Sequence, residues 1–84
     1  MLKPIHTIEC AQDGTVEQVY VQKDSYVYEW ERLFLVKTED GKLIDVSIGA
    51  SGHITEINVS AGDPINRKLP LALLQDDFVI TGSD

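Results

Sequence analysis

The apolar positions along this 84-residue chain recur with the period of β-strands. Apolar side chains alternate along 19–21, 33–35 and 57–59, and in part along 43–48. Turn-forming residues interrupt this pattern every eight to ten positions, at Asp13-Gly14, Asp24-Ser25, Asp40-Gly41, Ser51-Gly52 and Gly62-Asp63-Pro64. No segment shows ten residues of helical periodicity. The pattern therefore predicts an all-β chain of about seven or eight short strands.

The chain also repeats itself. Residues 14–36 align with 52–74 without a gap, at a constant offset of 38 residues. Seven pairs match in character: Gly14/Gly52, Val16/Ile54, Val19/Ile57, Val21/Val59, Val27/Ile65, Leu33/Leu71 and Leu35/Leu73. Each half is too small to bury its own apolar face, so we expect the halves to pack together around a pseudo-twofold axis.

This repeat predicts one domain over residues 1–84, with half-repeats at about 5–37 and 43–77. A hairpin at 37–43 links the halves and should protrude at one end of the sandwich. The alternation predicts a core made of Ile8, Cys10, Val16, Val19, Val21, Val27, Leu33, Leu35, Val46, Ile48, Ile54, Ile57, Val59, Ile65, Leu71 and Leu73.

The chain is acidic, with 14 Asp and Glu against seven Lys and Arg and a formal net charge of −7. Such a surface repels nucleic acid and anionic membranes. No apolar run reaches the roughly 18 residues of a membrane span, and the N-terminus has no signal-peptide core, so we expect a cytoplasmic location. The single cysteine, Cys10, excludes an intrachain disulfide and is expected to be a small buried hydrophobe.

The segment KTEDGKL contains an Asp-Gly pair, which is a strong signal for a tight hairpin. Asp40 and Gly41 suit a type I′ turn, in which both central residues have positive φ. They should form the hairpin tip, with Lys42 as the first residue after the turn. Lys42 is then either a solvated charge that balances nearby carboxylates or an attachment point for a prosthetic group.

Two stretches carry a resemblance to a known family. SGHITEINVSAGDPINRKLPLALLQ resembles the C-terminal half of a biotinyl/lipoyl carrier domain, and DGTVEQVYVQKDSYVYEWERLFLV resembles the matching N-terminal half. The shared pattern is a G-x-V-x-x-I-x-V-x-x-G-D-x-V ladder followed by a loop and a leucine-rich strand. The resemblance covers roughly residues 5–77 and includes biotin carboxyl carrier-like domains. It implies a barrel-sandwich hybrid, in which two short antiparallel sheets are related by quasi-twofold symmetry.

In this family a lysine at the hairpin tip carries biotin or lipoyl through an amide. The ungapped match places that lysine on Gly41, and Lys42 is a flanking residue. The resemblance therefore implies a domain without its attachment lysine and without a cofactor. Biotin or lipoate on Lys42 is the alternative.

Three turn positions depart from the family pattern. The family has a glycine about four residues before each Leu-x-Leu, where Trp30 and Lys68 stand here, and a Gly-Asp where this chain has Asp24-Ser25. We expect these positions to be less constrained by the backbone than in the family, or the turns to differ. Trp30 could also fill the place of the lost glycine.

Other candidate chemistry is sparse. Alternation sends Tyr20, Tyr26 and Tyr28 outward, and together with Trp30 they form the best candidate for a partner-binding or dimer surface, or else cover the edge of a thin core. His6 and His53 lack convergent companions for a metal site, and no catalytic constellation can be assembled. We expect Asp76-Asp77 to end the last strand and 78–84 to be a further strand or a loose tail.

The sequence leaves three hypotheses. The first is a non-catalytic, unmodified biotinyl/lipoyl-like domain that serves as a scaffold or interaction module for an unknown protein partner, with homo-oligomerisation left open. The second is a true carrier modified on Lys42. The third is a lipoyl-like piece of a membrane-fusion adaptor protein, although the helical hairpin usual in those proteins is missing.

Overall fold

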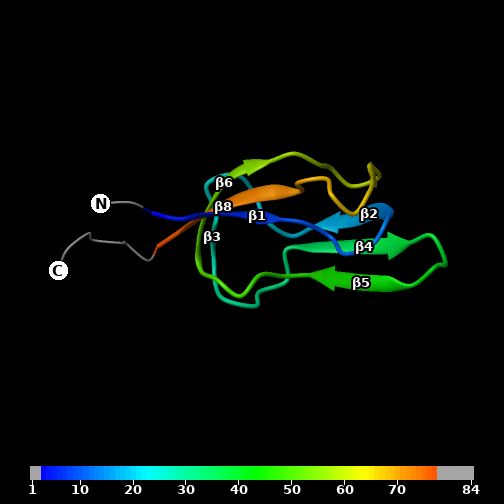
Figure 1. The fold of residues 1–84 in the computed structure, drawn as a ribbon, viewed down its shortest axis with the longest axis horizontal. Helices are drawn as coiled ribbons and strands as arrows, with labels where there is room; N and C mark the ends of the chain where they lie inside the picture. The colour runs from blue at the N-terminus through cyan, green and yellow to red at the C-terminus, as the bar shows by residue number, and fades with distance from the viewer. Residues whose placement is uncertain (1–2, 78–84) are drawn as a thin grey trace.

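The computed structural model describes residues 3–77, and all regular structure within them is β-strand. The strands are β1 (Ile5–Ile8), β2 (Gly14–Val19), β3 (Tyr26–Val27), β4 (Phe34–Thr38), β5 (Leu43–Val46), β6 (Gly52–Ile57), β7 (Pro64–Ile65) and β8 (Ala72–Asp76). They form two antiparallel four-stranded sheets with the orders β1-β8-β6-β3 and β5-β4-β2-β7 (Figure 1). The predicted all-β class is confirmed. No helix in this part of the chain is long and apolar enough to cross a membrane.

Each sheet takes two strands from each half of the chain. In one sheet β3 of the first half pairs with β6 of the second, and in the other sheet β7 of the second half pairs with β2 of the first. Strands β5 to β8 begin 38 residues after β1 to β4, so the two sheets have equivalent strand orders. Because neither sheet can form from one half alone, the exchange of strands holds the two halves together.

The core differs from the sequence prediction by one position in two strands. Leu35 and Leu73 were expected to be buried but are only half-buried, whereas their neighbours Val36 and Leu74 are fully buried. The reason is that Leu33 and Leu71 are buried just before β4 and β8 begin. The alternation of buried residues within each strand therefore starts at its first residue, Phe34 or Ala72, and not at the preceding leucine. A register shift in the partner strand lies opposite each half-buried leucine.

Most other predicted core positions are buried, including Cys10. Val19, Ile48 and Ile57 are half-buried and pack against the margin of the core. Phe34 and Ala72 are further core residues that the alternation did not predict. Strand β8 ends at Asp76, and the expectation for 78–84 concerns residues outside the described part of the chain.

Gly14 and Gly52 permit close backbone contacts at equivalent places in the two sheets. A Cβ atom at Gly14 would collide with the carbonyl oxygen of Lys37, and one at Gly52 with that of Gln75. Each glycine lies in a strand that pairs on both sides, so the neighbouring backbone has little room to move. The glycines of the repeat are therefore required by packing between strands.

Candidate functional site

The hairpin between β4 and β5 lies at the end of the molecule opposite the start of β1 and the end of β8, as Figure 1 shows. Its strands pair up to Lys37 and Leu43. Beyond them the Thr38 N–H donates to the Lys42 carbonyl at 2.7 Å, and the Gly41 N–H donates to the Thr38 carbonyl at 3.0 Å. The loop at the tip therefore consists of Glu39, Asp40 and Gly41.

The predicted type I′ turn is wrong. Gly41 has φ +88°, but Asp40 is not among the residues with positive φ. The hydrogen bonds instead define a type I turn followed by a left-handed glycine, which is the usual form of a three-residue hairpin loop. Asp40 and Gly41 still lie at the tip, and Glu39 joins them.

Thr38 organises this loop, although neither the strand period nor the turn signal marked it as a site residue. It is the one buried polar side chain among residues 3–77. Its hydroxyl donates to the Asp40 carboxylate and accepts from the Lys42 N–H at 3.1 Å. The Thr-x-Asp spacing is the available signal, because threonine hydroxyls often bond to groups within their own turn.

Lys42 lies at the base of the loop. Its backbone N–H and carbonyl both bond to Thr38. Its side chain is 78% exposed, and the ammonium nitrogen lies 3.9 Å from a carboxylate oxygen of Asp40. Such an exposed ion pair contributes little to stability. The carboxylate of Asp45, on the neighbouring strand, instead lies 4.0 Å from the guanidinium of Arg32.

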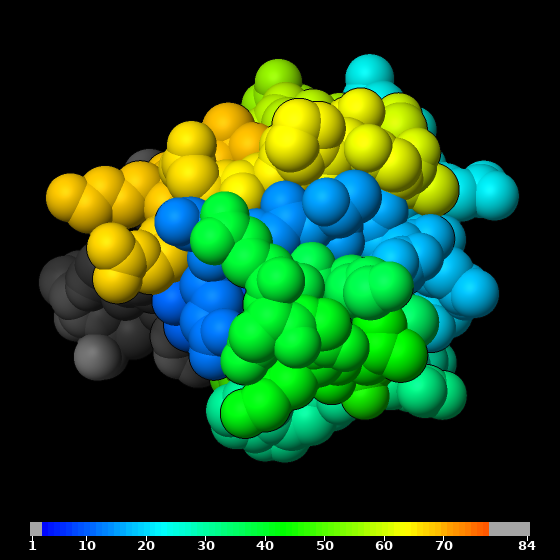
Figure 2. All heavy atoms as spheres, turned by 90° about the vertical axis from the view of Figure 1, so that its right-hand side faces the viewer, coloured from blue at the N-terminus to red at the C-terminus, as the bar shows by residue number. Residues whose placement is uncertain are grey.

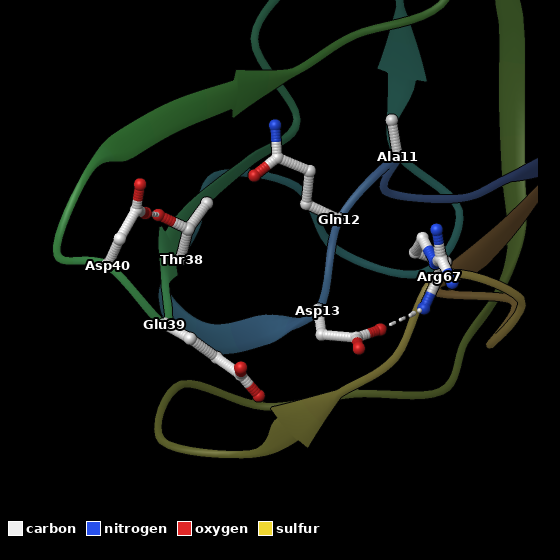
Figure 3. Close-up of a pocket in the computed structure, with 7 residues that line it drawn as sticks. All are labelled: Ala11, Gln12, Asp13, Thr38, Glu39, Asp40 and Arg67. Atoms are coloured by element: carbon white, nitrogen blue, oxygen red, sulfur yellow. Dashed lines mark hydrogen bonds between the residues drawn. The ribbon is translucent and has the colours of Figure 1, made fainter.

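A hollow of about 310 Å³ opens beside the hairpin, lined by Ala11, Gln12, Asp13, Thr38, Glu39, Asp40 and Arg67. Figure 2 looks onto this end, where the green hairpin lies beside the blue segment before β2 and the yellow segment after β7. Asp13 accepts a hydrogen bond of 2.8 Å from the Arg67 backbone N–H across the floor of the hollow (Figure 3). No group of three or more potential metal ligands gathers among residues 3–77.

The four exposed aromatic residues, Tyr20, Tyr26, Tyr28 and Trp30, contact different parts of the protein. The Tyr26 hydroxyl donates to the Asp77 carboxylate at 2.5 Å, and its ring packs edge-on against Tyr28 and His53, each at 5.1 Å between ring centroids. The hydrogen bond to Asp77 raises the pKa of Tyr26. Tyr20 instead lies under the guanidinium of Arg32, 5.6 Å from the ring centroid.

Trp30 has an unusual backbone for a bulky residue. The Glu31 N–H donates to the Tyr28 carbonyl at 3.1 Å, which closes a turn with Trp30 at its third position and φ +64°. This position favours glycine, and the Trp30 ring covers Gly49. The expectation that the backbone is less constrained at these positions is therefore wrong at Trp30. It is also wrong at Asp24, whose φ is +72°. Lys68 is free of this constraint because its φ is not positive.

No protein-family model matches the sequence, and no curated protein matches it. Several solved structures share its fold, including two carboxylases. One is a single-chain, multi-domain long-chain acyl-CoA carboxylase, with a TM-score of 0.79, 12% identity and 89% of this chain covered. The other is the urea carboxylase of Kluyveromyces lactis, with a TM-score of 0.76, 13% identity and 84% covered.

This chain spans only 7% and 6% of the lengths of those two proteins. At such low identity the likeness concerns the fold alone. Together with the two exchanged sheets, it confirms the predicted barrel-sandwich hybrid, the fold of biotinyl carrier-like domains.

Proposed function

We propose that this chain is a non-catalytic biotinyl/lipoyl-like domain that is not modified at its hairpin and works by binding a protein partner. The observation that carries the proposal is the composition of the hairpin tip, Glu39-Asp40-Gly41, which contains no amine. The domain would act as a scaffold or interaction module and not as an enzyme in its own right.

The local geometry argues against an attached biotinyl or lipoyl group. Amide formation by a ligase requires an amine presented at the apex, where this chain has Gly41. The nearby ammonium of Lys42 extends from a residue whose backbone is tied to Thr38 on both sides, and it faces the Asp40 carboxylate. Two more carboxylates, of Asp13 and Glu39, line the adjacent hollow. The residues of this hairpin therefore do not fit the group that the family carries.

A second candidate, a carrier modified on Lys42, is favoured by one observation. The Lys42 side chain is 78% exposed and lies only one residue beyond the tip. A ligase that tolerates this displacement would find an accessible amine.

Purified protein incubated with a biotin ligase or a lipoate ligase separates the two candidates. Wild type, Lys42→Arg and the matched hairpin variant Lys37→Arg are compared by intact mass, with a known biotinyl domain and a known lipoyl domain as positive controls. We expect no added mass on any of the three. A biotinyl or lipoyl adduct on wild type and Lys37→Arg that is missing from Lys42→Arg would establish the carrier instead.

A further inference from the structure

An exposed surface of aromatic and acidic residues lies toward the opposite end of the molecule from the hairpin. We define this acidic aromatic surface by Tyr26, Tyr28, Glu29, Trp30, Glu31 and Asp77. Figure 1 shows β3, which carries Tyr26, toward the end where β1 begins and β8 ends. Tyr28 and Trp30 are each 68% exposed, although large aromatic rings gain most when they are covered.

The backbone holds Trp30 in this exposed position at a cost. A left-handed conformation costs an ordinary residue more than glycine, and Trp30 keeps φ +64°. The turn is supported by Glu31, whose carboxylate accepts from the Tyr28 N–H at 3.0 Å and whose own N–H closes the turn. Backbone outliers of this kind cluster at ligand-binding sites, where they position a side chain.

The charges around these rings are negative. Residues 24–31 contain Asp24, Glu29 and Glu31 and no lysine or arginine. Asp77 adds a further carboxylate through its bond to Tyr26. The next residue, Arg32, has its guanidinium over Tyr20 and near Asp45, so it is engaged elsewhere.

A second copy of this chain is a poor occupant for the surface. A twofold dimer would place the same acidic patch against itself, and each chain carries a formal net charge of −7. A cationic side chain fits instead, because guanidinium and ammonium groups bind over tyrosine and tryptophan faces and pair with carboxylates.

From these observations we propose that the acidic aromatic surface binds an arginine-bearing basic segment of a protein partner. An arginine side chain would lie against the exposed ring of Tyr28 or Trp30. The carboxylates of Glu29 and Glu31 would pair with its guanidinium group. This inference rests on the proposed interaction role and names the chemistry of the partner.

Titration with a short peptide of alternating arginine and glycine tests the proposal. Trp30 is the only tryptophan of the chain, so its fluorescence reports directly on the surface. The matched probe is the same peptide with citrulline in place of arginine, which keeps the shape and removes the charge. We expect the arginine peptide to change the Trp30 emission, to bind more weakly as salt is raised, and to bind better than the citrulline peptide.

Variants locate the binding. Tyr28→Ser and Glu29→Gln should each weaken the arginine peptide by about threefold, in line with an exposed cation–π contact or ion pair. The control Glu39→Gln, which makes the same change as Glu29→Gln but in the hairpin, should bind like wild type. Circular dichroism verifies that each variant is folded.

Three results would overturn the proposal. They are equal binding of the citrulline peptide, unchanged affinity in both Tyr28→Ser and Glu29→Gln, and Trp30 emission that depends on protein concentration without peptide, which would indicate self-association. Modification of Lys42 would contradict the proposed function but would leave these results unaffected, because the hairpin is at the other end of the molecule.

Discussion

At the scale of single residues, two of the positions that depart from the glycine pattern of the family, Asp24 and Trp30, are third residues of turns with positive φ. Asp24 and Gly62, which are 38 residues apart, both have positive φ, so the first half keeps the conformation without the glycine. Sequence alone indicated that glycines had been replaced at Asp24 and Trp30. It could not show whether the backbone had relaxed, because the N–H groups of Asp24 and Trp30 also donate to carbonyls that are distant in sequence, those of Ile54 and Ile48.

Gly62→Ala should lower the free energy of unfolding by about 1 kcal/mol. Gly62 has φ +95°, and a Cβ there would have no atom within 4 Å, so the loss comes from the backbone alone. Asp24→Gly is the matched control and should show no such loss. Urea unfolding measures the free energy of unfolding of both variants. A Gly62→Ala protein as stable as wild type would contradict the positive φ of Gly62.

The pKa of Tyr26 should lie above its usual value of 10.0, mainly because its neutral hydroxyl donates to Asp77. The contribution of this bond to stability is present below the unfolded pKa and is lost as pH rises through the higher folded pKa. In an alkaline absorbance titration, Tyr26→Phe should therefore remove a tyrosine step whose midpoint lies above pH 10.0. If both proteins titrate alike, the bond does not form in solution.

At the scale of elements, the strand period predicted the fold class and most of the core. It failed at Leu35 and Leu73 because a buried leucine stands just before each strand, and the alternation was counted from that leucine. The hairpin was placed correctly by the Asp-Gly pair, but its loop length depends on Thr38, whose bonds to Asp40 and Lys42 the turn signal does not contain.

Leu74→Ala and Leu73→Ala provide a matched test of the corrected strand phase. Leu74 is fully buried in β8, so its truncation should cost about 2–4 kcal/mol. Leu73 is half-buried, and its truncation should cost less than about 1.5 kcal/mol. Urea denaturation measures the free energy of unfolding of both variants. A larger loss for Leu73→Ala than for Leu74→Ala would support the sequence prediction, in which Leu73 is the buried residue.

At the scale of the whole molecule, the 38-residue offset carried the prediction furthest, because strands with that spacing occupy equivalent places in the two sheets. The hollow beside the hairpin was not predictable. It brings Asp13, Thr38 and Arg67 together from three separate segments, and only the exchange of strands places those segments at one end. The net charge of −7 bears on the choice of partner at this scale, because it disfavours anionic partners and favours basic ones.

The central claim is that the hairpin tip offers no amine for attachment, and the intact mass of the chain isolated from cells with active biotin and lipoate ligases tests it most directly. We expect the mass of the unmodified sequence for both wild type and Lys42→Arg. A wild-type mass raised by one biotinyl or lipoyl group, and restored in Lys42→Arg to that of its unmodified sequence, would contradict the claim.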